Sequence, residues 1–509
     1  MKFDVVIVGA GLGGLSAGAT LAQNGKRVHL IESHDKVGGF ATNYRRGKYR
    51  MEAGIHMLSG DHPHSLYHHL FKQFNINESI TLVKSPQFYQ CHFNGKSFSM
   101  PFGITEAKEK LIKSFPHEKA GVEKFFSTMI LISENFRDFI FREPFISATN
   151  PFFSAIFPHF EQFWRISIGQ FLDGIIQDRE LKTILLANVT FYHDKHYELN
   201  LVQYMISQIN YFLGGGYYIQ GGSQVFSDHL KNIIESNGGT ITLRHKVEKI
   251  KVQNNKATHI YYRKIIGTDQ ELKACEADFI VYNGAIPNLY EHILEGEDVE
   301  YFKRKESKCK QWGLSTSAST LYFGLKQPLS ELGSTAYMNL FIETKANDQL
   351  LNPNRESFGV LDYNQIPTQL CPNGHYAVEV ITMDQMSQWD RLDYQLVNYK
   401  NKKHFYEKKL INKMAEYFPS FKEQILFSEV STPQTILRYT HSPMGAIYGY
   451  LPSIDSFRER SFGLHFKSGS QDEKIKNLFF ASAWSFLPGF TGALLAGHKT
   501  ALELERHFQ

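Results

Sequence analysis

Short apolar runs separated by polar breaks mark the start of the chain. The run FDVVIV (residues 3–8) is rich in β-branched side chains and predicts a buried parallel strand, while LSAGATLAQ (15–23) predicts a helix and RVHLIE (27–32) a second strand. The stretch Val5–Gly25 is uncharged and long enough to span a membrane, but its glycines and polar residues favour this strand–helix–strand unit. A signal peptide is not expected, because the positive region and the small-residue cleavage site that it needs are not evident.

The same kind of pattern predicts elements along the rest of the chain. Residues 85–100 alternate and turn at Asn94-Gly95, which predicts a hairpin, and residues 105–215 are mostly helical in pattern. Residues 223–239 predict an amphipathic helix that ends at glycine, and residues 240–263 predict strand, turn and strand. Further strands are expected at ADFIVY (277–282), SASTLYFGL (317–325) and HYAVEVITM (375–383). The segment NLFFASAWSFLPGFTGALLAG (477–497) should begin with a strand, and its proline and glycines favour a following loop and helix over a second membrane span.

Glycines after the first predicted strand have the spacing of a dinucleotide-binding loop. Gly9, Gly11 and Gly14 match G-x-G-x-x-G, which permits a tight turn, a close approach to pyrophosphate and close packing of the helix on the strand. Gly13 belongs to the same loop, and the helix that follows would direct the positive end of its dipole at the phosphates. Glu32 ends the second strand, where a carboxylate accepts hydrogen bonds from both ribose hydroxyls and repels a 2′-phosphate.

The residues after Glu32 favour FAD over NAD. Gly38 and Gly39 let the chain pass close to the diphosphate, as the longer flavin nucleotide requires. A second G-x-G-x-x-G framed by a strand and an acid is not found, because the glycine-rich FLGGGYYIQGG (212–222) lacks that frame. The sequence therefore predicts one dinucleotide site and an unidentified electron donor or acceptor, such as a quinone, a reduced carrier or O2.

Composition and charge argue against several classes of ligand and binding partner. The chain of 509 residues is long enough for several domains, and its net charge of +4 gives no indication of nucleic-acid binding. Its four cysteines are scattered without a C-x-x-C pair, which fits a reducing cytoplasm and argues against a disulfide scaffold or a zinc site. We expect no metal and no nucleic acid.

Phenylalanine and tryptophan concentrate between Gly121 and Ile175. Within that window, residues 144–160 (PFISATNPFFSAIFPHF) carry no Asp, Glu, Lys or Arg, and two prolines interrupt them, so a spanning helix is not expected. Two interpretations stay open. One is a buried cap over the core, and the other is an apolar tunnel wall or a membrane-dipping patch flanked by Arg142 and Arg165.

Four segments together resemble the FAD-dependent amine oxidase superfamily, and within it the branch of phytoene desaturases, carotenoid isomerases and retinol saturases. They are Gly9–Gly39; EAGIHML (Glu52–Leu58), similar to F-D-x-G-I-H but with Glu52 where Asp is usual; TPQTILRYTHSPMGAIYG (Thr432–Gly449), which is specific to this branch; and LPGFTGALLAG (Leu487–Gly497). The resemblance implies an α/β fold with α+β insertions: a discontinuous Rossmann-like FAD-binding domain of the glutathione-reductase type, an inserted substrate domain and a helical, aromatic-rich cap.

The resemblance also implies further contacts and domain limits. Val247 should place backbone groups at the adenine, the YNGAIP turn (Tyr282–Pro287) should lie along FAD, and the loop with Gly489 and Gly492 should face the flavin ring. The domain limits are expected as follows: FAD-binding parts at 1–85, 215–300 and 451–509, and substrate or cap parts at 86–214 and 301–450.

His56 in GIHML is the candidate catalytic residue. Hydride transfer at flavin N5 needs the substrate carbon in contact with the ring, and saturation of a double bond also needs a proton for the neighbouring carbon. Histidine is the common acid near neutral pH, although His56 could instead only hydrogen-bond a nearby loop. Tyr439 and Tyr448 are candidates for lining the site, with core packing as the preferred interpretation.

The predicted function is that of an FAD-dependent oxidoreductase acting on carbon–carbon double bonds of an apolar isoprenoid or polyene, retinoid- or carotenoid-like, as a saturase or a desaturase. Three alternatives stay open: a redox-neutral cis–trans isomerase, an amine oxidase, and a flavin-binding scaffold at a membrane. Because apolar substrates of this kind reside in bilayers, we expect a cytoplasmic protein with peripheral membrane contact.

Overall fold

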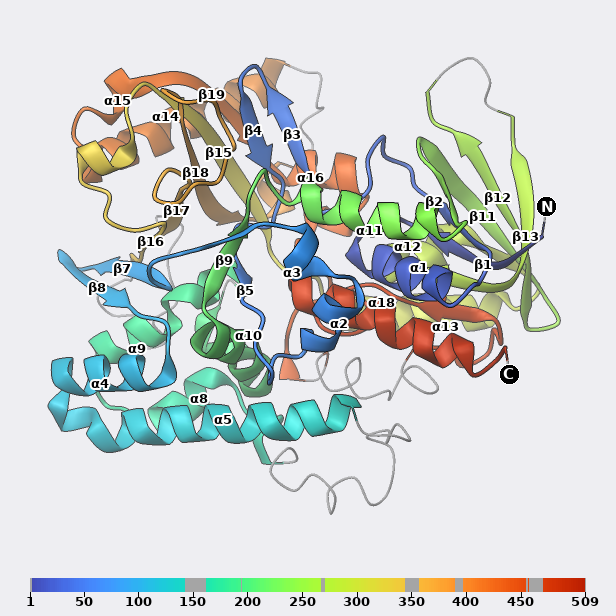
Figure 1. Cartoon of the computed structure of the whole chain (residues 1–509), viewed down its shortest axis with the longest axis horizontal. Coiled ribbons are helices and arrows are strands. Elements are labelled where there is room, and N and C mark those ends of the chain that lie inside the picture. Colours follow the sequence, from blue (N-terminus) through green and yellow to red (C-terminus); the bar gives the residue numbers. More distant parts are fainter. Residues whose placement is uncertain are drawn as a thin grey trace.

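The computed structural model describes residues 2–141, 162–193, 195–266, 271–343, 357–389, 397–454, 456 and 470–508. Figure 1 shows a sheet of parallel and antiparallel strands with its helices on the right, a second sheet at the upper left and a group of helices below that second sheet. The mixed α/β architecture agrees with the predicted fold class.

The first sheet is built around the predicted strand–helix–strand unit. Strand β1 (Lys2–Val8), helix α1 (Leu12–Gln23) and strand β2 (Val28–Ile31) follow in order, and β1 pairs in parallel with β2 and with β13 (Lys273–Tyr282). Strand β20 (Leu478–Phe480) pairs in parallel with β13. Every residue of β2 is buried, as expected of a β-branched run in a parallel sheet covered on both faces.

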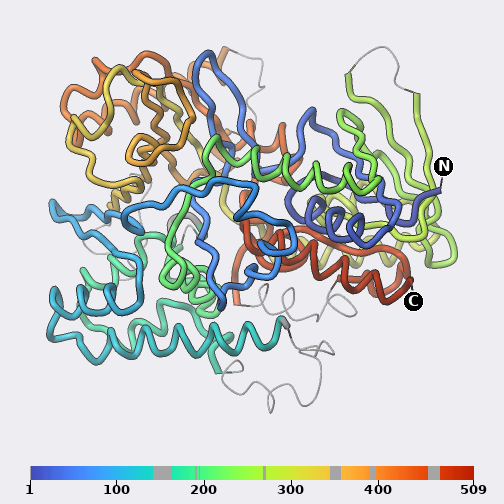
Figure 2. Tube along the Cα trace, viewed as in Figure 1, coloured from blue at the N-terminus to red at the C-terminus, as the bar shows by residue number. Residues whose placement is uncertain are grey.

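Three helices from distant parts of the chain contact one another against this sheet. Helix α1 packs against α11 (Gln224–Ser236) and against α18 (Gly489–Glu505), so both ends of the chain lie side by side (Figures 1 and 2). The two long uncharged stretches are therefore strand, loop and helix. Among the described residues, no helix is both long and apolar enough to cross a bilayer.

The strand–turn–strand prediction for residues 240–263 holds with one correction. The first expected strand is two strands, β10 (Thr240–Thr242) and β11 (His245–Gln253), because the left-handed backbone of Arg244, with φ 59°, turns the chain between them. Strand β10 pairs with β2, while β11 pairs with β12 (Lys256–Lys264) and with β14 (Leu294–Gly296).

A second sheet joins an early hairpin to a late segment. The hairpin of β7 (Tyr89–Phe93) and β8 (Lys96–Met100) turns at Asn94-Gly95, both with positive φ, as predicted. Its strand β7 pairs in parallel with a late strand, β16 (Met338–Phe341). The remaining strands of this sheet are β15 (Ser317–Leu325), β17 (Phe358–Asp362), β18 (Tyr376–Asp384) and β19 (Ile425–Ser431).

Helices dominate residues 104–214, as the sequence pattern predicts. They gather at the lower left of Figure 1 and comprise α4 (Ile104–Ser114), α5 (Lys119–Phe141), α8 (Ile168–Asp173), α9 (Arg179–Leu186) and α10 (Leu201–Gly214). Four phenylalanines of the aromatic window, Phe125, Phe126, Phe136 and Phe139, are buried in the core. The uncharged segment at 144–160 lies outside the described residues.

Short elements connect these layers. Strands β5 (Leu58–Ser59) and β6 (Leu82–Lys84) pair with β9 (Gly216–Ile219). The other elements are β3 (Asn43–Arg46), β4 (Tyr49–Glu52), α2 (His68–Gln73), α3 (Ile76–Ser79), α12 (Ile286–Asn288), α13 (Val299–Gln311), α14 (Val397–Tyr417), α15 (Phe421–Gln424) and α16 (Pro433–Thr440). The division into FAD-binding segments at 1–85, 215–300 and 451–509 and substrate or cap segments at 86–214 and 301–450 stays a proposal. The strand pairings are compatible with it.

Candidate FAD and substrate cavity

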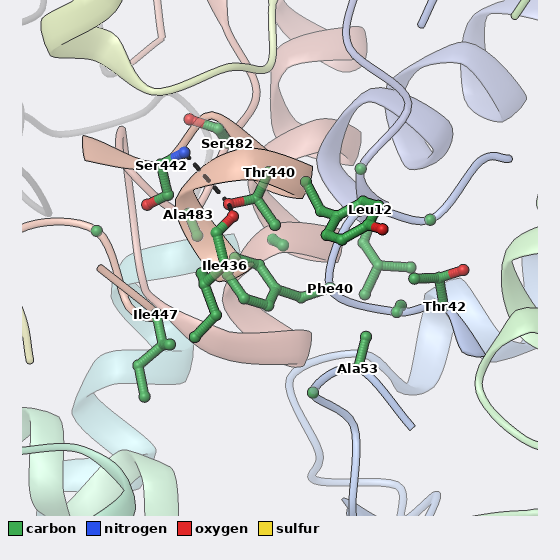
Figure 3. Close-up of a pocket in the computed structure, with 18 of the residues that line it drawn as sticks. Leu12, Phe40, Thr42, Ala53, Ile436, Thr440, Ser442, Ile447, Ser482 and Ala483 are labelled. Carbon is green, nitrogen blue, oxygen red and sulfur yellow. Dashed lines mark hydrogen bonds between the residues drawn. The ribbon is translucent and has the colours of Figure 1, made fainter. Parts of the chain in front are cut away.

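A cavity of about 1010 Å³ collects the residues that the sequence analysis singled out. Side chains of the N-terminal segment, Leu12, Phe40 and Thr42, lie across it from Ile436 and Ile447 (Figure 3). Its wall includes His56 and the predicted cofactor residues Gly9, Gly11, Gly13, Glu32, Gly38, Gly39, Val247, Gly489 and Gly492. These residues come from four separate regions of the sequence.

Gly14 is the predicted cofactor residue that does not line the cavity, and its role is packing. A Cβ on Gly14 would lie 2.2 Å from the carbonyl oxygen of Gly9, so a side chain there would push the helix away from the loop. A Cβ on Gly13 would lie 1.5 Å from the carbonyl oxygen of Ala481 at the end of β20. The glycines therefore let α1 begin directly against the ends of two parallel strands, as the G-x-G-x-x-G pattern requires.

Glu32 lies at the end of β2 and fixes the glycine loop. Its Oε2 accepts a hydrogen bond from the backbone N–H of Ala10 at 2.6 Å, and its Oε1 accepts one from the N–H of His34 at 2.7 Å. The carboxylate is thus held at the cavity wall by two backbone donors, a role that the motif alone does not reveal.

Two helix N-termini open onto the cavity. Gly11 precedes α1, and Pro488 precedes α18, whose first turn also lines the wall. The helices approach closely because a Cβ on Gly497 would lie 2.0 Å from the Gly13 carbonyl oxygen, and Ser16 Oγ donates to the carbonyl of Leu494 at 2.8 Å. Two positive dipole ends and an open glycine cradle fit the diphosphate of FAD and the negative charge that a flavin gains on reduction.

His56 lies on the cavity wall with one ring nitrogen held by the second sheet. Its Nδ1 lies 2.9 Å from Tyr363 Oη and 3.3 Å from Glu379 Oε2. Tyr363 Oη also donates to Glu379 Oε2, at 3.2 Å, and Tyr337 Oη donates to the carbonyl of His56. Tyr363 lies in the turn that follows β17, and Glu379 lies on β18. His56 therefore does bond a loop residue, as in the alternative interpretation, and it also contacts the second sheet.

Two buried carboxyl groups lie behind His56. Glu379 is 1% exposed and accepts the backbone N–H of Glu52 at Oε1, 2.9 Å away. Glu52 is fully buried and accepts hydrogen bonds from Tyr218 Oη and from the N–H and hydroxyl of Ser223. Burial raises the pKa of Glu52 to about 7, although the bonds from Ser223 oppose the rise.

The remaining wall is largely apolar. It is formed by α10, by one face of the second sheet and by α16, through residues that include Ile206, Ala318, Ile381, Met383 and Ile436. Both candidate tyrosines, Tyr439 and Tyr448, line the cavity, although core packing is the interpretation that the sequence favours.

Tyr448 forms a ring contact on this wall. Its ring centroid lies 5.6 Å from that of Tyr192, with the rings tilted by 34°. A group held between two facing rings needs roughly 7 Å between them, so these rings leave no slot for an ammonium group. Among the described residues, no group of three or more His, Cys, Asp or Glu side chains is placed to hold a metal ion.

The sequence of residues 12–391 matches the family described as flavin containing amine oxidoreductase. The match spans well over half of the chain, so the chain belongs to this family and is an FAD-dependent oxidoreductase. This family assignment agrees with the resemblance drawn from the four sequence segments.

Three relatives are similar over most of the chain. All-trans-retinol 13,14-reductase of Danio rerio is 23% identical, covering 96% of this chain and 84% of its own length. The 1-hydroxycarotenoid 3,4-desaturase of Flavobacterium sp. (strain P99-3) is 25% identical, covering 87% and 88%. Prolycopene isomerase 1 of an Oncidium hybrid cultivar is 21% identical, covering 89% and 76%.

Solved structures show the same fold. An oxidoreductase from Methanosarcina mazei aligns over 100% of both chains with a TM-score of 0.60 and 18% identity. Putrescine oxidase bound to putrescine aligns over 99% of both chains with a TM-score of 0.63 and 15% identity. At this level of identity the likeness concerns the fold alone.

Proposed function

We propose that this enzyme reduces a carbon–carbon double bond of an apolar polyene, with His56 as the proton donor. FAD, when bound and reduced, supplies the hydride at N5. The imidazole gives a proton to the neighbouring carbon, so the double bond gains two hydrogens while the flavin is oxidised. An unidentified electron donor then restores the reduced flavin.

The position of His56 is the observation that carries this proposal. Nδ1 is held by Tyr363 and Glu379, while Nε2 makes no hydrogen bond within the described part of the chain. An imidazole fixed through one nitrogen at the wall of an apolar cavity can present the other nitrogen to a substrate. The similarity to a retinol reductase over nearly the whole chain supports the same direction of electron flow.

The FAD contacts are part of the proposal. The glycine loop and the N-terminus of α1 would hold the diphosphate, Glu32 would bind the ribose, and Val247 would lie at the adenine. Gly489 and Gly492 at the start of α18 would face the flavin ring. The apolar wall of α10 and the second sheet would exclude water from the reacting carbons.

Product mass tests the reaction. The FAD-loaded enzyme is incubated anaerobically with retinol and with carotenoid precursors, once with reduced and once with oxidised flavin. A gain of two hydrogens with reduced flavin is expected. A loss of two hydrogens with oxidised flavin would make the enzyme a desaturase, unchanged mass with altered retention an isomerase, and turnover of amines alone an amine oxidase.

A His56→Gln variant tests the proton donor. It should keep its FAD and lose at least a hundredfold in reduction rate, because general acid catalysis contributes about that much. His92→Gln is the matched control: His92 is half-buried in the second sheet, bonded to Asn339, and does not line the cavity. Equal rates for His56→Gln and the wild type would refute the role of His56.

We also propose peripheral contact with a membrane. Leu437 and Tyr439 line the cavity and are 38% and 50% exposed, so apolar surface continues from the cavity to the outside. Flotation with anionic liposomes should carry the protein upward, and replacing both residues with serine should reduce it. A protein that stays in the aqueous fraction would refute this contact.

A further inference from the structure

Helix α10 presents a polar stripe within the largely apolar part of the cavity wall. Gln203, Ser207 and Asn210 follow one another at the spacing that places side chains on one face of a helix, and all three line the cavity. Ile206 and Tyr211 line it from the same helix. A helix that only covered a hydrocarbon would present apolar side chains at these positions.

Two of these side chains lack partners. Ser207 is satisfied, because its Oγ donates to the carbonyl of Tyr204 at 2.8 Å. Gln203 is 3% exposed, and its Oε1 is buried without a hydrogen bond in the part of the chain that the structure describes. Asn210 is 5% exposed, and its carboxamide bonds to no described residue.

A neighbouring carboxamide shows how such groups are normally paired. Gln208 lies on the same helix but does not line the cavity, and its Oε1 accepts a hydrogen bond from Asn188 Nδ2 at 3.0 Å. Most buried polar groups in proteins have partners of this kind, since an unpaired one costs free energy. The two unpaired carboxamides therefore indicate a ligand.

The polar stripe lies close to the candidate proton donor. Tyr211, which follows Asn210, donates a hydrogen bond from its Oη to the carbonyl of Met57 at 3.1 Å, and Met57 follows His56. The α10 wall and His56 are therefore neighbouring parts of the same cavity lining.

We propose that Gln203 and Asn210 bind a hydroxyl group of the polyene, so that the enzyme selects oxygenated polyenes over pure hydrocarbons. This inference rests on the proposed function and names its substrate class. A carboxamide offers both a donor and an acceptor, and so does a hydroxyl group. Because the carboxamides are neutral, the pair suits an alcohol better than a carboxylate, which would need a positive charge when desolvated.

The expected selectivity follows from the cost of unpaired groups. A hydrocarbon would leave both carboxamides without a hydrogen-bond partner. Sites built to bond a substrate hydroxyl reject the analogue lacking it by large factors. We expect the wild type to bind the alcohol at least tenfold more tightly than the deoxygenated analogue of the same length.

The test measures binding of retinol and of its deoxygenated hydrocarbon analogue to the FAD-loaded enzyme, by changes in flavin absorbance. The double variant Gln203→Met and Asn210→Leu should lose the preference, because it binds the alcohol more weakly and the hydrocarbon more tightly. Gln208→Met is the control on the same helix, and it should keep the wild-type ratio of the two dissociation constants.

The outcomes separate this inference from the proposed function. A preference in binding without any reduction would uphold the polar site and refute the reductase proposal. Equal binding of both ligands by the wild type would overturn the inference, and this measurement needs no variant. A double variant that releases FAD would also overturn it, because the carboxamides would then belong to the cofactor contacts.

Discussion

Replacing Glu52 with glutamine should stabilise the enzyme at alkaline pH. The side chain is fully buried, and burial raises the pKa of Glu52 from its usual 4.5 to about 7. Between these values the folded chain binds the proton more tightly than the unfolded chain does. The stability that this carboxyl contributes is therefore complete below pH 4.5 and is lost as the pH rises through 7.

The size of the effect follows from the two pKa values. One pKa unit corresponds to about 1.4 kcal/mol, so the loss between pH 4.5 and alkaline pH amounts to roughly 3 kcal/mol. Glutamine stays neutral, and its oxygen can still accept the hydrogen bonds from Tyr218 and from the Ser223 N–H. Its amide can donate to the Ser223 hydroxyl, which rotates to accept.

Thermal unfolding at pH 5 and pH 8, with saturating FAD, measures the difference. An unfolding entropy of about 2.1 cal/mol/K per residue converts roughly 3 kcal/mol into a rise of roughly 3 °C for a chain of this length. The melting temperature of Glu52→Gln should exceed that of the wild type by this amount at pH 8, with a much smaller difference at pH 5.

Glu118→Gln is the matched control. Glu118 is also buried, but one of its carboxylate oxygens accepts the backbone N–H groups of Gln177 and Asp178 at 2.7 and 2.5 Å. Its replacement should weaken these bonds and lower the melting temperature at both pH values. A lower melting temperature of Glu52→Gln at pH 8 would refute the argument from burial, and so would an equal rise at both pH values.

Three further substitutions test the glycine loop, the carboxylate at the end of β2 and the N-terminus of α16. Gly13→Ala should abolish FAD content, because its Cβ would lie 1.5 Å from the Ala481 carbonyl oxygen, whereas Gly174→Ala, with 3.5 Å to its nearest neighbour, should leave it unchanged. Glu32→Ala should weaken FAD binding by roughly tenfold to a hundredfold in equilibrium dialysis, as expected when a charged hydrogen-bond acceptor is lost. Thr432→Ala removes the N-cap of α16 and should lower unfolding free energy by about 1 kcal/mol in denaturant titrations.

Local patterns predict the first nucleotide-binding unit well because each part of it is encoded within a few residues. The β-branched run, the glycines and the acid at the end of β2 lie within the first 32 residues, and the structure brings them to one cavity. The break at Arg244 was missed, because nothing in the residue type requires its left-handed backbone.

The partners of His56 could not be predicted. Tyr363 and Glu379 lie more than 300 residues further along the chain than His56. Tyr363 directly follows β17 and Glu379 lies on β18, and the hydrophobic pattern of such strands indicates which residues are buried but not which residues they contact. A glutamate within the apolar strand HYAVEVITM was the available signal, because a charged residue in a buried strand needs a partner. The polar stripe of α10 had a similar signal, since Gln203, Ser207 and Asn210 share one face of a mostly apolar helix.

Two buried glutamates lie behind His56: Glu379 contacts the imidazole and also accepts the backbone N–H of Glu52. Two carboxylates behind one imidazole would repel each other in a buried site, so the arrangement is favourable when one of them is neutral. Burial and the neighbouring Glu379 both raise the pKa of Glu52, which keeps Glu52 protonated below about pH 7. Glu379 is then the carboxyl that contacts His56 Nδ1. Ionisation of Glu52 above that pH would place its negative charge behind the imidazole, so Glu52→Gln should change the pH profile of reduction as well as stability.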